Sequence, residues 1–75
     1  MNSLNKLAAY RKLYNLTQED VAKYLNISNV SYSYKETGKQ DFRLLEAKAL
    51  SELFNASIED IFFTDKVNIK FTKIV

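Results

Sequence analysis

Chemically reactive side chains are scarce in this chain of 75 residues. It contains no Cys and no His, which excludes thiol nucleophiles, imidazole bases, disulfides and the usual sulfur and nitrogen metal ligands. Among the nine carboxylates, two pairs are adjacent in the sequence, Glu19 with Asp20 and Glu59 with Asp60. Adjacent residues on a helix point apart, so neither pair can share a pocket for acid–base catalysis. The sequence therefore predicts no catalytic residue, no metal site, no cofactor and no enzyme.

Charge is distributed unevenly along the chain, although the net charge is only +2. Residues 1 to 43 carry seven Lys or Arg against four Asp or Glu, residues 44 to 65 carry one against five, and residues 66 to 75 carry three against none. The N-terminal part is suited to a polyanion, although charges on a small protein also cluster by chance. No apolar run in the chain is long enough for a membrane span, and the N-terminus does not resemble a signal sequence. We therefore expect a cytoplasmic protein without a membrane partner.

Two amphipathic helices are indicated in the first 25 residues. The first is predicted over residues 3 to 13 with Ser3 as its N-cap, because apolar and inward-facing positions recur at helical spacing at Leu4, Leu7, Ala8, Arg11 and Tyr14. Thr17 and Asp20 then have the spacing of a capping box, which predicts a second helix from Gln18. Its buried stripe would consist of Val21, Ala22 and Leu25.

A third helix is predicted after a very short turn. Asn26 tolerates the left-handed conformation that a tight turn needs, and Ile27 would fill the corner. Ser28 would cap a helix that runs to about residue 36, buries Tyr32 and ends at Gly38. Two helices joined by so short a turn are typical of the helix-turn-helix, whose second helix enters the major groove of DNA; an ordinary helical hairpin is the alternative.

The rest of the helical pattern follows Gly38. We expect Asp41 to cap a fourth helix, which Asn55 ends, and Ser57 with Asp60 to open a short fifth helix. The predicted apolar positions of these two helices are Leu44, Ala47, Leu50 and Phe54, with Leu45 beside them, and then Ile58, Ile61 and Phe62.

Three segments together resemble the Cro/C1-type (XRE) helix-turn-helix family of phage repressors and Cro proteins: "RKLYNLTQEDVAKYLNIS", "YKETGK" and "FNASIEDIFF". The resemblance covers roughly residues 4 to 63 and implies an all-α, five-helix lambda-repressor-like domain. It also implies a sequence-specific transcriptional regulator, a Cro-like repressor of a phage or mobile element that binds double-stranded DNA as a homodimer. The alternative is an interaction module on the same fold, an antitoxin or anti-repressor that binds a protein partner.

The resemblance assigns base reading to the start of the third helix. It places Ser28, Asn29 and Val30 at the major groove, with Ser33 and Tyr34 one turn further along the same face. Asn suits adenine and Val can contact a thymine methyl group, so we expect A·T pairs in the half-site.

Phosphate contacts are implied for the residues around this helix. The matching positions are Gln18, at the start of the second helix, and Lys39 and Arg43, beyond the glycine. Lys35 stands where the family usually has an apolar residue, so that side of the helix either packs less well or frees Lys35 to reach a phosphate.

A structural salt bridge between Arg11 and Glu36 is also implied. The first helix places Arg11 on its inward side and Glu36 ends the third helix, so the pair would tie the two together as it does in this family. Losing one partner of a buried pair would strand a charge.

The C-terminal segment departs from the helical pattern. Val67, Ile69 and Phe71 alternate with polar residues, which predicts a β-strand. We therefore divide the chain into a DNA-binding domain, residues 1–65, and an arm, residues 66–75. A lone strand in a helical chain must fray, lie on the protein's own surface or pair with another chain. We expect pairing between two copies of the chain, so the arm would be a dimerisation element.

Overall fold

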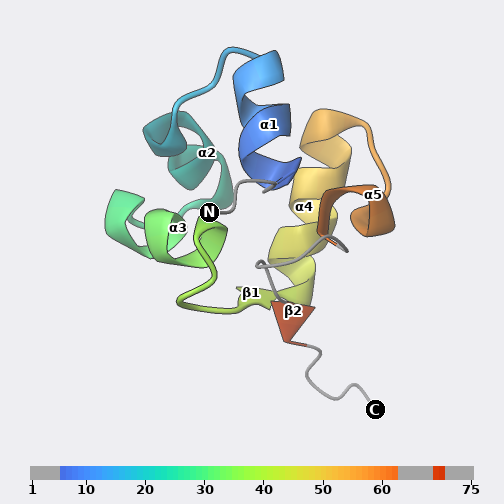
Figure 1. The fold of residues 1–75 in the computed structure, drawn as a ribbon. Coiled ribbons are helices and arrows are strands. Elements are labelled where there is room, and N and C mark those ends of the chain that lie inside the picture. Colours follow the sequence, from blue (N-terminus) through green and yellow to red (C-terminus); the bar gives the residue numbers. More distant parts are fainter. Residues whose placement is uncertain (1–5, 63–68, 71–75) are drawn as a thin grey trace.

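The computed structural model describes residues 6–62 and 69–70 of the chain, and these residues form five helices and two short strands. The elements are α1 (Lys6–Leu13), α2 (Gln18–Leu25), α3 (Asn29–Glu36), β1 (Phe42–Arg43), α4 (Leu44–Phe54), α5 (Ile58–Phe62) and β2 (Ile69–Lys70). Figure 1 shows α2 and α3 on one side of α1, and α4 and α5 on the other. The predicted all-α fold with five helices is confirmed. None of the helices in these ranges is long and apolar enough to cross a bilayer.

Local side-chain chemistry sets the boundaries of α2. The backbone N–H of Asp20 donates to Thr17 Oγ1 at 3.0 Å, and the N–H of Thr17 donates to Asp20 Oδ2 at 2.8 Å. This reciprocal pair is the predicted capping box, and it satisfies two backbone donors that a helix start leaves unpaired. At the other end Asn26 is left-handed, with φ 62° and ψ 42°. The predicted start and end of α2 are confirmed.

The hydrophobic core lies between the two groups of helices and draws on every helix. Its largest fully buried side chain in α3 is Tyr32, as the sequence predicted. Phe42 is also fully buried, although the sequence pattern gave no reason to place it in the core. Its ring makes edge contacts with Tyr32 and Phe62. The buried apolar residues are Leu7, Val21, Ala22, Tyr32, Phe42, Ala47, Leu50, Phe54, Ile61 and Phe62.

The start of α4 differs from the prediction. Its N-cap residue is Arg43, not Asp41, and the Glu46 carboxylate accepts a hydrogen bond from the Arg43 backbone N–H at 2.9 Å. Burial of Phe42 explains the difference, because the chain must stay extended through β1 before the helix begins. Asp41 is exposed two residues upstream of the N-cap.

The strand β2 has a partner within the chain. It pairs in parallel with β1, with Phe42 opposite Ile69 and Arg43 opposite Lys70, at the foot of α4 in Figure 1. The premise that a C-terminal strand would lack a partner in its own chain is therefore wrong, because Phe42 and Arg43 provide an extended edge that the sequence pattern did not indicate. Ser3, Leu4, Val67 and Phe71 lie outside the described residues, as does the side chain of Ile69.

Candidate nucleic-acid interface

A three-residue turn, residues 26 to 28, joins α2 to α3. The N–H of Ile27 donates to the Ala22 carbonyl at 3.0 Å, which closes the end of α2. Ser28 then caps α3, with its Oγ accepting from the Ser31 N–H at 3.0 Å. Ile27 packs against the core from this turn. Local contacts thus define the end of α2 and the start of α3.

The two faces of α3 differ sharply in exposure. The inner face buries Tyr32 and Glu36 against the domain. At the outer face of the N-terminal end, Asn29 is exposed and the Val30 residue is 62% exposed. An apolar side chain so exposed beside a polar one offers both a methyl contact and amide hydrogen bonds to a ligand. Of the other predicted base-reading residues, Ser28 and Tyr34 are exposed and Ser33 is half-buried.

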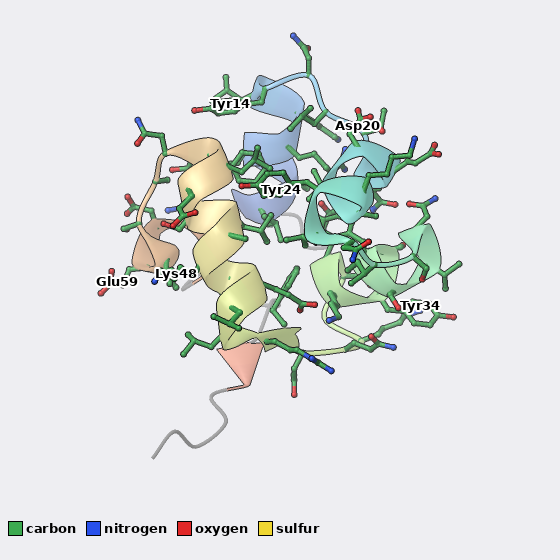
Figure 2. The ribbon with its side chains drawn as sticks, turned by 180° about the vertical axis from the view of Figure 1, so that it is seen from behind. Tyr14, Asp20, Tyr24, Tyr34, Lys48 and Glu59 are labelled. Atoms are coloured by element: carbon green, nitrogen blue, oxygen red, sulfur yellow. The ribbon has the colours of Figure 1, made fainter. Side chains whose placement is uncertain are left out.

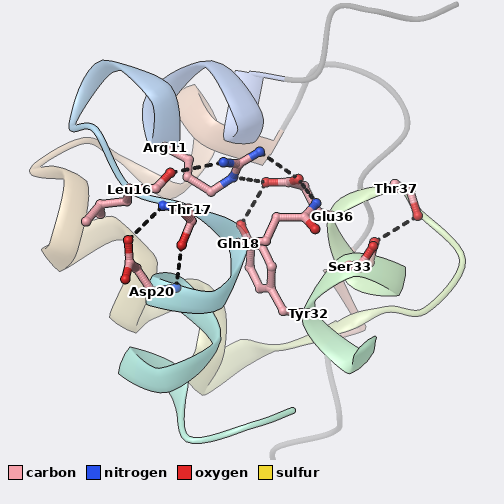
Figure 3. A network of polar contacts seen from close by, with 9 residues as sticks. All are labelled: Arg11, Leu16, Thr17, Gln18, Asp20, Tyr32, Ser33, Glu36 and Thr37. Carbon is pink, nitrogen blue, oxygen red and sulfur yellow. Dashed lines mark hydrogen bonds and ion pairs between the residues drawn. The ribbon is translucent and has the colours of Figure 1, made fainter. Parts of the chain in front are cut away.

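A polar network around Glu36 anchors the other end of α3 (Figure 3). Arg11 donates from Nε to Oε2 at 2.8 Å and from Nη2 to Oε1 at 3.3 Å. Gln18 Nε2 donates to Oε1 at 2.7 Å, and the Tyr32 hydroxyl donates to Oε2 at 3.0 Å. Arg11 Nη1 also donates to the Leu16 carbonyl at 3.0 Å. The ion pair expected between Arg11 and Glu36 is therefore present, and the network joins α1, the α1–α2 turn, α2 and α3.

Burial and hydrogen bonding alter the titration of two groups in this network. The hydrogen bond to Glu36 raises the pKa of Arg11 above its ordinary value. The pKa of Tyr32 is raised far above its ordinary value of 10.0. Burial is the largest cause, and the negative charge of Glu36 is the next. Tyr32 therefore stays protonated as a donor, and Arg11 stays charged.

Gln18 occupies the first position of α2 and is half-buried. One of its amide hydrogens is directed to Glu36, so Gln18 braces α3. A primary amide carries two N–H donors, so this contact is compatible with a second bond to a phosphate. The phosphate contact of Gln18 stays a prediction.

Lys35 does not face outward. Its ammonium lies 2.7 Å from Glu46 Oε1, and the side chains of Lys35 and Glu46 are only 10% and 13% exposed. The ammonium also lies 6.0 Å from the centre of the Phe42 ring. The phosphate contact of Lys35 stays a prediction, and this structure does not favour it, because Glu46 already holds the charge of Lys35 on the inner side of α3. The suggested poor packing is wrong, because Lys35 is buried.

The segment after α3 presents the remaining predicted phosphate contacts. Lys39 is exposed, and its ammonium lies 5.6 Å from the centre of the Tyr34 ring. The backbone N–H groups of Lys39 and Gln40 both donate to the Tyr34 carbonyl, at 2.8 and 3.1 Å. Arg43 is exposed at the start of α4. Figure 2 shows Tyr34 on the α3 side of the molecule, whereas Lys48 and Glu59 lie on the α4 and α5 side.

Sequence reasoning missed two residues that shape this surface. Glu46 binds both Lys35 and the Arg43 N–H, and its place three residues after the N-cap is the capping-box spacing that could have revealed the second contact. Thr37 Oγ1 donates to the Ser33 carbonyl at 2.9 Å and secures the last turn of α3. Threonine back-bonding of this kind has no distinctive signal in a single sequence.

Comparisons with known proteins agree with this geometry. The model of a family described as helix-turn-helix matches residues 7–61. An uncharacterized HTH-type transcriptional regulator of Methanocaldococcus jannaschii is 48% identical over 58 residues, which cover 77% of this chain and 88% of that protein. Two uncharacterized HTH-type transcriptional regulators of Archaeoglobus fulgidus are 34% and 33% identical, over 81% and 80% of this chain and 86% of each relative.

Proposed function

We propose that this chain is a Cro-like repressor. The proposal starts from its family: the chain belongs to the helix-turn-helix family of DNA-binding transcriptional regulators. It would bind a pseudo-palindromic operator as a homodimer and block transcription by occupying the promoter. Its place of action would be the cytoplasm.

The observation that carries this proposal is the division of α3 into an anchored end and a free end. Arg11, Gln18 and Tyr32 donate to Glu36 and fix the C-terminal turn, while Asn29 and Val30 are exposed at the N-terminal turn. A recognition helix needs this arrangement, because base-edge contacts require a rigid helix whose first residues are free to enter the major groove. In our proposal Asn29 makes a bidentate contact with adenine, and Val30 contacts a thymine methyl group.

Exposed cations beside α3 would supply the affinity that does not depend on sequence. Lys39 lies in the segment after α3 and Arg43 at the start of α4, and phosphate contacts of such residues set the register of a protein on the duplex. The contact between Lys39 and the Tyr34 ring limits where that ammonium can lie. Gln18 would add a neutral phosphate contact while it holds Glu36.

The dimer would form through β2. Within residues 6–62 and 69–70, the sheet contains only β1 and β2, so β2 has one edge on which a second copy could add its own strand. A two-fold axis at that edge would relate two recognition helices, whose spacing must match one DNA turn, ~34 Å, for a palindromic site. The predicted dimer residues Val67, Ile69 and Phe71 would contribute to this contact.

Base reading is tested by selecting bound sites from random DNA and measuring Kd for variants on the selected site. Asn29→Ala should lose about 1–3 kcal/mol on that site and relax the preference at one base pair in each half-site. Lys39→Ala should weaken binding to all sequences and reduce the salt slope by about one unit. Lys48→Ala is the matched control, since it removes the same charge from the opposite side of the domain. An unchanged sequence preference in Asn29→Ala would overturn the assignment of α3.

The dimer is tested by sedimentation of the full chain, of a variant that lacks residues 66 to 75, and of Ile69→Asp. Both variants should be monomeric and should lose most of their affinity for a full site but not for a half-site. Thr72→Asp is the matched control, because the sequence alternation assigns position 72 to the opposite face of the strand. A truncated chain that remained dimeric with full operator affinity would overturn the strand dimer.

The phage or mobile-element origin stays a prediction, and the neighbouring genes test it. Tight binding to a protein without affinity for DNA would favour the interaction module in place of the repressor.

A further inference from the structure

One oxygen of Glu46 joins the two ends of the connection that links α3 to α4. Glu46 Oε1 lies 2.7 Å from the ammonium of Lys35, in the last turn of α3. The same oxygen accepts the hydrogen bond from the Arg43 backbone N–H at 2.9 Å, at the start of α4. Lys39 and Arg43, the proposed phosphate contacts, lie on this connection and at its end.

The surroundings of Glu46 favour a fixed contact over a loose surface ion pair. The side chains of Lys35 and Glu46 are 10% and 13% exposed. Phe42, fully buried, lies beneath them with its ring centre 6.0 Å from the Lys35 ammonium. Charges with so little access to water are screened little, and the two hydrogen bonds restrict the side chains to one arrangement.

We infer that Glu46 is a positioning residue for DNA binding, which holds Lys39 and Arg43 in register with the recognition helix through its contacts with Lys35 and the Arg43 backbone. The inference rests on the proposed function, in which Lys39 and Arg43 contact phosphates. Lys35 and Glu46 act through these neighbours and make no contact with DNA themselves.

The sign of the effect separates this role from a simple charge effect. Removal of a carboxylate near a DNA-binding surface normally strengthens binding, because it reduces repulsion from the phosphates. Removal of Glu46 should instead weaken binding, because the connection loses its fixed geometry. Glu52 provides a matched control, since it is an exposed carboxylate on the same helix.

The experiment measures Kd for the selected DNA site and for random DNA with Glu46→Ala and Glu46→Gln, each beside the same change at Glu52. Glu46→Ala should raise Kd on both DNAs about tenfold, as expected when one charge-assisted contact is lost from a binding arrangement. Glu46→Gln retains an acceptor for the Arg43 N–H and should have a smaller effect of the same sign. Both Glu52 variants should leave Kd unchanged or lower it. Lys35→Arg should keep most of the affinity that Lys35→Met loses.

A double-mutant cycle shows whether Glu46 acts through the proposed cations. In a Lys39→Ala, Arg43→Ala background, Glu46→Gln should produce no further loss. The inference would be overturned if Glu46→Gln weakened DNA binding further in that background. It would also be overturned if Glu46→Gln alone tightened binding, as Glu52→Gln is allowed to do. Circular dichroism at the binding temperature checks that each variant is folded. If Glu46→Ala is unfolded, the Kd values of Glu46→Gln test the inference. Failure of the proposed function looks different, since the unaltered chain would then show no site preference and Lys39→Ala would have no effect.

Discussion

Replacement of Arg11 by Met should remove a large part of the stability of this domain. Arg11 is the only cation among the three side chains shown donating to Glu36, and the Glu36 side chain is only 4% exposed. The variant keeps the aliphatic part of the side chain but removes the positive charge of Arg11 from beside a buried carboxylate. The Leu16 carbonyl also loses the hydrogen bond from Nη1.

The size of the effect follows from what remains around Glu36. Breaking a buried ion pair from one side generally costs about 3–5 kcal/mol. Gln18 and Tyr32 still donate to the carboxylate at 2.7 and 3.0 Å, so we expect the lower end, roughly 3 kcal/mol, for Arg11→Met. Glu36→Gln should cost roughly the same, because its new amide group would place a donor against donors. A domain of this length has roughly 4–11 kcal/mol in total, so either change would consume much of it.

Urea denaturation followed by circular dichroism measures the free energy of unfolding for the two single variants and the double variant. The double variant, Arg11→Met with Glu36→Gln, should lose less than the sum, because both charges of the ion pair are removed together. Lys48→Met with Glu52→Gln is the matched control; both residues are exposed on α4, and each change should stay within about 0.5 kcal/mol. Single effects below about 1 kcal/mol that simply add in the double variant would refute the idea that this pair ties α3 to α1.

Three further changes test other parts of the structure. Asn26→Ala should destabilise the domain by about 1–2 kcal/mol in thermal unfolding, because Ala disfavours the left-handed conformation, whereas Asn26→Gly should be nearly neutral; equal effects would refute the role given to Asn26. The backbone hydrogen bond from Thr17 lowers the pKa of Asp20 below its ordinary 3.8, so the stability due to this carboxylate is present above pH 3.8 and is lost as the pH falls through the lowered pKa. The difference in unfolding free energy between the unaltered chain and Asp20→Asn should therefore vanish in acid, and a difference that persists there would have another cause. Tyr32→Phe should cost about 1–2 kcal/mol at neutral pH through the lost hydrogen bond to Glu36. It should also reduce the loss of stability above pH 10, where the unfolded tyrosine ionises first, and identical curves of unfolding free energy against pH in the alkaline range would argue against this.

Elements set by neighbouring residues could be predicted from the sequence. The capping box of Thr17 and Asp20, the left-handed Asn26 and the cap at Ser28 depend on hydrogen bonds within three residues, and all three are present. The same local rules predicted which residues lie at the exposed N-terminal end of α3, because the position of the cap at Ser28 fixes where the helix begins.

Contacts between distant residues could not be predicted in this way. Lys35 looked like a free cation because its partner Glu46 lies eleven residues away, on the next helix. Phe42 and its strand were missed because a two-residue strand has no detectable period. The partner of Ile69 was missed for the same reason, since β1 becomes a pairing edge only after α3 and α4 have packed around Phe42.

The parallel pairing of β1 with β2 has a consequence for the order in which the chain folds. Phe42 meets Ile69 only after the chain has passed through α4 and α5, whereas α2 and α3 meet across a three-residue turn. Closing a longer loop costs more entropy, so contacts within the helix pair form early and the strand pair forms late. The chain contains no Pro, so no slow prolyl isomerisation delays either step. We therefore expect the helix pair of α2 and α3 to be in contact before β2 takes its place beside β1.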